Sequence, residues 1–159
     1  MATLYPLPDS ARVKTLLAMM FDGLDVKAGG RFEAGPASSA YVAVFIGDDG
    51  KPGALCACDI ALAANISSAR SMLTPAAAKE AAKSKQLTDV MLANLREVMN
   101  ICSRLLITDG SPHLKLDQVY PAKAVPAAAM AIFGAAKGRV DFEIGVAKYG
   151  PGLMSVLST

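Results

Sequence analysis

The stretch NLREVMNICSRLL, residues 94–106, places a carboxylate, Glu97, three residues before a carboxamide, Asn100, inside a helical pattern. Three residues make nearly one turn of an α-helix, so the two side chains are neighbours on its surface. A carboxamide cannot act as a base at neutral pH, but it can accept one hydrogen bond from a water molecule and donate another to it. The pair can therefore do chemistry together, or it can simply keep one face of the helix in water.

The helix that carries this pair is predicted to run from about Thr88 to Ile107. At about 100° per residue, one broad face of it is apolar. That face consists of Val90, Met91, Leu95, Val98, Ile101, Cys102, Leu105 and Leu106. The opposite face is a single ridge, which we call the outer ridge, made of Ala93, Glu97, Asn100 and Arg104.

A solvated helix face is the simplest interpretation of the outer ridge. Glu97 fits it, because glutamate is a good helix former. Asn100 fits it less well, because the amide of asparagine competes for main-chain hydrogen bonds and makes it a poor residue for the middle of a helix. Composition alone leaves both interpretations open.

Other residues that could do chemistry are weaker candidates. His113 is the only histidine, so a zinc site or a histidine relay would need scattered carboxylates and cysteines, and Ser103 resembles no known nucleophile. Neither residue is predicted to be catalytic. Core packing rather than redox chemistry is expected for all three cysteines, Cys56, Cys58 and Cys102.

Three further features have ordinary structural explanations. The pair Asp48 and Asp49 is typical of a turn, and so are Gly29 and Gly30, which lack the strand and helix that a phosphate-binding loop needs. Basic residues at 79, 83 and 85 are interpreted as a solvated helix face rather than a docking patch.

The chain of 159 residues is long enough to form one domain, and the sequence predicts a single domain over residues 1–159. A net charge of +2 with 6% aromatic residues argues against nucleic-acid binding. The longest apolar stretch, residues 124–136, is shorter than the roughly 20 residues of a membrane helix. The N-terminus has no basic leader followed by an apolar segment, so a cytoplasmic location is expected.

The pattern of elements predicts an α+β fold. A helix begins near Asp9 and ends at Gly23, an extended segment follows, and residues 40–60 form a hairpin whose turn contains Asp48, Asp49, Gly50 and the pair Pro52–Gly53. Helices at residues 61–73 and 74–85 precede the long helix. After it come a strand at residues 113–120 and a hairpin with its turn at residues 150–152. The order helix, strand, hairpin thus occurs twice, which predicts two similar halves sharing one largely antiparallel sheet with helices against it.

The motif Glu97-Val98-Met99-Asn100 resembles the signature of the CheC/CheX/FliY family of chemotaxis phosphatases, most closely its CheX-like branch. The resemblance extends over most of residues 10–157, where it rests on hydrophobicity and on the order of the elements. It implies a CheC/CheX-like fold, removal of the phosphoryl group from the aspartyl phosphate of a CheY-like receiver domain, and a homodimer.

Carried over residue by residue, the resemblance implies that Asn100 orients the attacking water and that Glu97 anchors the receiver through the receiver's lysine. Ala93 and Arg104 would contact the partner beside them. The chain would need no cofactor or metal of its own, because the receiver supplies Mg²⁺ and the lysine that offset the charge of the phosphoryl group.

The sequence departs from the family pattern at two places. Ala93 stands where the family often has an acidic or hydroxyl residue, and Pro121 is near, but not clearly at, the position of an expected proline. The first helix lacks the second Glu-x-x-Asn motif of CheC proteins, which favours the CheX arrangement. A non-catalytic CheX-like module that binds a receiver or another signalling protein is therefore the alternative.

Overall fold

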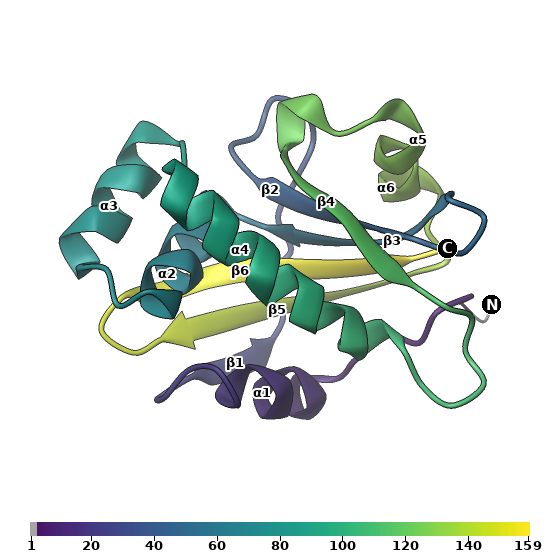
Figure 1. Ribbon diagram of the computed structural model, residues 1–159, viewed down its shortest axis with the longest axis horizontal. Coiled ribbons are helices and arrows are strands. Elements are labelled where there is room, and N and C mark those ends of the chain that lie inside the picture. The colour runs from purple at the N-terminus through teal and green to yellow at the C-terminus, as the bar shows by residue number, and fades with distance from the viewer. Residues whose placement is uncertain (1–2) are drawn as a thin grey trace.

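The computed structural model describes residues 3–159, and Figure 1 shows how its elements are arranged. The longer helices are α1 (Ser10–Ala18), α2 (Ile60–Arg70), α3 (Pro75–Ser84) and α4 (Asp89–Cys102). Short helical segments are η1 (Ser103–Leu106), η2 (Ala122–Ala124), α5 (Ala127–Met130) and α6 (Ile132–Ala135). The strands are β1 (Asp25–Ala28), β2 (Tyr41–Ile46), β3 (Pro52–Cys58), β4 (Lys115–Pro121), β5 (Gly138–Val146) and β6 (Gly150–Ser158).

The sheet has six strands in the order β1-β5-β6-β3-β2-β4, and every pair is antiparallel. The hairpins β2–β3 and β5–β6 meet at its centre. Each half's first strand pairs with the other half's hairpin, since β1 lies against β5 and β4 lies against β2. Neither half completes its part of the sheet alone, so the two predicted halves are present and interlocked. The predicted α+β class with an antiparallel sheet is confirmed.

Both faces of the sheet are covered, as alternation along β2 shows. Tyr41, Ala43 and Phe45 point into the larger core, where α1, α2 and α4 pack on one side of the sheet (Figure 1). Val42 and Val44 point into a smaller core on the other side, with residues of the β1–β2 connection and of α5 and α6. Alternate residues of a strand face opposite sides, so a strand covered on both sides is apolar throughout.

The turn of the second hairpin differs from the prediction. Gly150, Pro151 and Gly152 lie in β6, and residues 147–149 form the turn, where Lys148 has a φ of +75°. In the same way Pro52 and Gly53 of the first hairpin lie in β3, although its other predicted turn residues do lie in the turn. The sequence analysis attributed these glycines and prolines to turn formation. For two of them, Gly152 and Gly53, close packing against the strands is the explanation instead.

Gly152 and Gly53 leave space for groups that pack directly on the sheet. A Cβ atom on Gly152 would lie 2.4 Å from the main-chain nitrogen of Leu62, at the start of α2. A Cβ atom on Gly53 would lie 2.5 Å from Cε2 of Tyr5. The missing side chains therefore let α2 and the Tyr5 ring approach the sheet closely.

Replacing Gly152 by alanine is expected to lower the free energy of unfolding by about 2 kcal/mol, because the new methyl group meets helix backbone that cannot move aside cheaply. Urea denaturation followed by circular dichroism measures the change. Gly134, which has nothing within 4 Å of a built Cβ, is the matched control for a Gly→Ala substitution. Equal stability of the two variants would contradict the close approach of α2 to β6.

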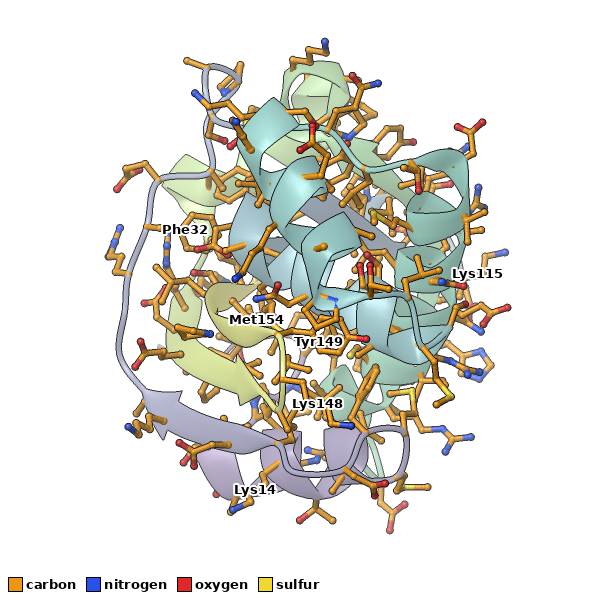
Figure 2. All side chains as sticks on the ribbon, turned by 90° about the vertical axis from the view of Figure 1, so that its left-hand side faces the viewer. Lys14, Phe32, Lys115, Lys148, Tyr149 and Met154 are labelled. Atoms are coloured by element: carbon orange, nitrogen blue, oxygen red, sulfur yellow. The ribbon has the colours of Figure 1, made fainter. Side chains whose placement is uncertain are left out.

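The β5–β6 turn is also tied to the helical layer. Tyr149, labelled with Lys148 at this turn in Figure 2, donates a hydrogen bond to the main-chain oxygen of Leu73 between α2 and α3.

Within residues 3–159, no helix is long and apolar enough to cross a membrane.

Candidate functional site

Helix α4 has clear signals at both ends. Thr88 is its N-cap and accepts a hydrogen bond from the main-chain nitrogen of Met91 at 3.2 Å, and Asp89 places a negative charge in the first turn. The regular helix stops at Cys102 and tightens into η1, so it is shorter than predicted, although the helical segment reaches Leu106. The Glu97–Asn100 pair lies within the regular part, where main-chain hydrogen bonds hold the two side chains at a fixed spacing.

The buried face of α4 differs from the predicted apolar face near both ends of the helix. Val90 is 56% exposed and Ile101 is only half-buried, whereas Met99 is buried. Val90 lies seven residues before Glu97, which is about two helical turns, so it shares the face of the outer ridge. The prediction that Val90 belongs to the core face was wrong, because α4 packs against α2 as well as against β4 and its buried face is turned accordingly.

The outer ridge is confirmed as an exposed face. Ala93, Glu97, Asn100 and Arg104 are all exposed. Within residues 3–159, no group forms a hydrogen bond with the carboxamide of Asn100, and only its main-chain oxygen accepts one, from the hydroxyl of Ser103 at 2.7 Å. The carboxamide therefore presents its donor and acceptor to whatever docks on the ridge.

Glu97 is held from the neighbouring helix. Its Oε2 lies 3.5 Å from a terminal guanidinium nitrogen of Arg70, the last residue of α2, and both side chains are substantially exposed. A solvent-exposed pair of this kind contributes less than about 1 kcal/mol to stability. The ion pair mainly orients the Glu97 side chain. It holds the carboxylate towards α2, while the second carboxylate oxygen stays available for a cation on a partner.

The sequence analysis missed Asn94, which lies on the same helix as Asn100 but inside the protein. It is 9% exposed. Its Nδ2 donates to the main-chain oxygen of Ser67 at 3.0 Å and to the hydroxyl of Ser71 at 2.7 Å. Both acceptors lie at the end of α2, where main-chain oxygens lack partners within the helix, so Asn94 joins the two helices. The sequence does show an asparagine beside the apolar face of the helix, between Ala93 and Leu95. A polar residue in that place does not reveal that its hydrogen-bond partner lies on another helix.

The other polar residues considered in the sequence make local contacts. His113 Nδ1 lies 3.4 Å from Asp48 Oδ1, but both side chains are 84% exposed. The hydroxyl of Ser103 is bound to the main chain of its own helix. Asp49 accepts a hydrogen bond from the main-chain nitrogen of Lys51, as expected in a turn. The part of the chain described here contains no cluster of three histidine, cysteine, aspartate or glutamate residues that could hold a metal ion.

All three cysteines are buried and unpaired, which confirms that they pack in the interior. A hydrogen bond with Cys58, together with burial, raises the pKa of Cys56. Burial raises the pKa of Cys102 well above its ordinary value. Because only the thiolate is a good nucleophile, a raised pKa lowers reactivity at neutral pH.

We expect iodoacetamide at pH 8 to leave the native protein unmodified and to add three groups after unfolding in urea, one for each cysteine. Burial keeps the reagent away from all three thiols, and the raised pKa values of Cys56 and Cys102 lower the amount of thiolate in the folded chain at this pH. Intact-protein mass spectrometry counts the added groups. Rapid labelling of folded protein would show that a thiol is accessible and would contradict the buried arrangement.

Comparison with known proteins rests on structure alone. No protein-family model and no curated protein sequence matches the chain. The crystal structure of a CheX–CheY–BeF3–Mg complex from Borrelia burgdorferi matches with a TM-score of 0.55 and 15% identity, over 94% of this chain and 97% of that one. FliY from Thermotoga maritima matches with a TM-score of 0.53 and 15% identity, over 91% of this chain and 81% of that one. The chain has the CheC/CheX/FliY fold.

The CheX-like fold is shared with FliM. A FliM–SpeE complex from H. pylori matches with a TM-score of 0.59 and 11% identity, over 94% of this chain and 78% of that one. At these identities the similarity shows a common fold, and the predicted resemblance is confirmed at that level.

Proposed function

We propose that this chain is a CheX-like phosphatase that accelerates dephosphorylation of the aspartyl phosphate of a CheY-like receiver domain. The observation that carries the proposal is the exposed, unengaged carboxamide of Asn100, one turn from Glu97 on a rigid helix. An exposed asparagine is mildly unfavourable in the middle of a helix, so its position favours a task outside the helix. The fold shared with CheX, which has been crystallised with CheY, BeF3 and Mg, supports the choice of partner.

In the proposed reaction, Asn100 enters the receiver's active site and holds one water molecule in line with the phosphorus atom. The water oxygen forms a bond to phosphorus while the bond from phosphorus to the aspartyl oxygen breaks, which leaves a carboxylate and inorganic phosphate. Positioning is the main contribution, because the transition state needs little covalent help from the protein. Mg²⁺ and a lysine of the receiver would balance the charge, and this chain would contribute no metal.

Glu97 would anchor the receiver through that lysine. Its second carboxylate oxygen remains available beside the contact with Arg70, so an added cation need not displace the arginine. Ala93 and Arg104 flank the pair on the outer ridge and would contact the partner's surface. The small side chain of Ala93 supplies neither charge nor hydroxyl, so chemistry would fall to Asn100 alone.

The proposal is tested by mixing the chain with each phosphorylated receiver from the same genome and following loss of the phosphoryl group. The proposal predicts faster loss for at least one receiver. Unchanged rates for all of them would sink it. Gene neighbours that encode a receiver indicate which partner to test first.

A non-catalytic binding module is the second candidate. Ala93 favours it, because the acidic or hydroxyl residue common in the family is missing there. The same fold also occurs in FliM, which has been crystallised in complexes with SpeE and with FliG, and this supports a binding role as the alternative. Receiver binding without faster hydrolysis would support this candidate.

A homodimer and a cytoplasmic location remain predictions. The strands at the two ends of the sheet, β1 and β4, each pair on one side only within residues 3–159. Sedimentation velocity over a range of concentrations tests the dimer directly.

A further inference from the structure

A groove lies between α1 and η1, next to the outer ridge. Its volume is about 230 Å³, and it is lined by Arg12, Thr15, Leu16, Met19, Arg104 and Leu105. Arg104 belongs to both the groove and the outer ridge. The groove therefore continues the surface on which Asn100 is exposed.

The charged side chains that line the groove are all positive. Its lining contains two arginines and no carboxylate, and neither arginine forms one of the ion pairs in this part of the chain. Arg12 is fixed, because one of its terminal nitrogens donates to the main-chain oxygens of Arg104 and Ile107, both at 2.8 Å. A fixed guanidinium loses little conformational freedom when it binds a carboxylate.

The rest of the lining is mostly apolar. Leu105 is 2% exposed and lies at the bottom of the groove, Leu16 is half-buried, and Met19 is 71% exposed at its side. An unbranched methionine adapts to the shape of an incoming apolar group. The groove therefore suits a segment that carries an acidic side chain beside an apolar one.

The position of the groove selects the occupant. Arg104 lies in η1, four residues after Asn100, which is about one helical turn further along the chain. A protein whose reacting group sits against Asn100 must also cover Arg104. We propose that the groove binds an acidic residue and an adjacent apolar residue on the receiver's surface, within about one helical turn of its phosphorylated aspartate, and so sets the alignment of the partner. This inference rests on the proposed function.

The test measures binding of the receiver, held in its phosphorylated form by BeF3⁻ and Mg²⁺, to charge and apolar variants of the whole chain. Arg104→Glu is expected to raise the dissociation constant about 10-fold by opposing an acidic partner residue. Met19→Ser is expected to raise it about 5-fold by removing apolar contact. Arg12 is left intact because its hydrogen bonds also hold the end of η1.

Two matched controls separate the groove from general effects. Lys83→Glu makes the same change of charge on an exposed residue of α3 outside the groove, and Met72→Ser removes a methionine that is 90% exposed elsewhere. Both controls are expected to bind like wild type. Circular dichroism confirms that each variant is folded.

The outcomes distinguish the groove from the proposed function. Wild-type binding that Arg104→Glu and Met19→Ser leave unchanged overturns the groove and leaves the proposed function standing. Failure of every receiver to bind overturns both. If replacing one acidic receiver residue by lysine weakens binding to the wild-type chain and restores binding to Arg104→Glu, the groove is supported and the contact is identified.

Discussion

Replacing Asn100 by alanine is expected to reduce the accelerated dephosphorylation of the receiver about 100-fold, because a water molecule that is no longer held in line reacts from many unproductive positions. The main-chain fold should persist. Asn100 is exposed and its carboxamide has no partner within residues 3–159, while alanine is the better helix former. Single-turnover loss of the phosphoryl group, measured with excess chain, gives the rate constant for hydrolysis.

Binding must be measured beside this rate. If Asn100 acts on the water, the alanine variant should bind the BeF3⁻-activated receiver nearly as well as wild type and differ mainly in the rate constant. Lys83→Ala, on an exposed position of α3, is the control and should hydrolyse at the wild-type rate. An Asn100→Ala variant as active as wild type would exclude Asn100 from the reaction.

Replacing Asn94 by alanine is expected to lower the free energy of unfolding by about 3 kcal/mol, which corresponds to a fall in Tm of about 8 °C. The substitution removes both hydrogen bonds to the end of α2 and leaves the buried oxygen of Ser67 without this donor. It also leaves a small space between the helices. Urea titration gives the free energy, and a scanning calorimeter gives Tm.

The two asparagines are therefore predicted to behave in opposite ways, although they lie six residues apart on one helix. Asn94→Ala should lower stability and, at a temperature where it is folded, retain hydrolysis. Asn100→Ala should keep stability and lose hydrolysis. Loss of stability at Asn100 with none at Asn94 would mean that the face of α4 has been assigned wrongly.

The periodicity of the sequence predicted most of the fold. Apolar spacing, cap residues and turn residues located the four longer helices and both hairpins, and the repeated order of elements predicted two halves that share one sheet. The outer ridge was predicted because a helix with one buried face must expose the other. These features depend on short-range patterns that any single sequence contains.

Contacts between distant segments account for what the sequence analysis got wrong. Val90 was assigned to the core because it is apolar. Which residues of α4 are buried depends instead on where α2 packs against that helix. Asn94 passed unnoticed because its acceptors lie more than 20 residues away in the chain. Gly152 was attributed to a turn because nothing local reveals that Leu62 packs directly against it. The groove beside Arg104 likewise forms only when α1 packs against η1.

The most direct measurement of the central claim is steady-state release of inorganic phosphate from a receiver that a small phosphate donor keeps phosphorylated. One chain is added for many receivers. A phosphatase predicts release that increases in proportion to the amount of wild-type chain and is nearly absent with Asn100→Ala. Release that is unchanged or slowed by a chain that binds the receiver would contradict catalysis and leave a binding module.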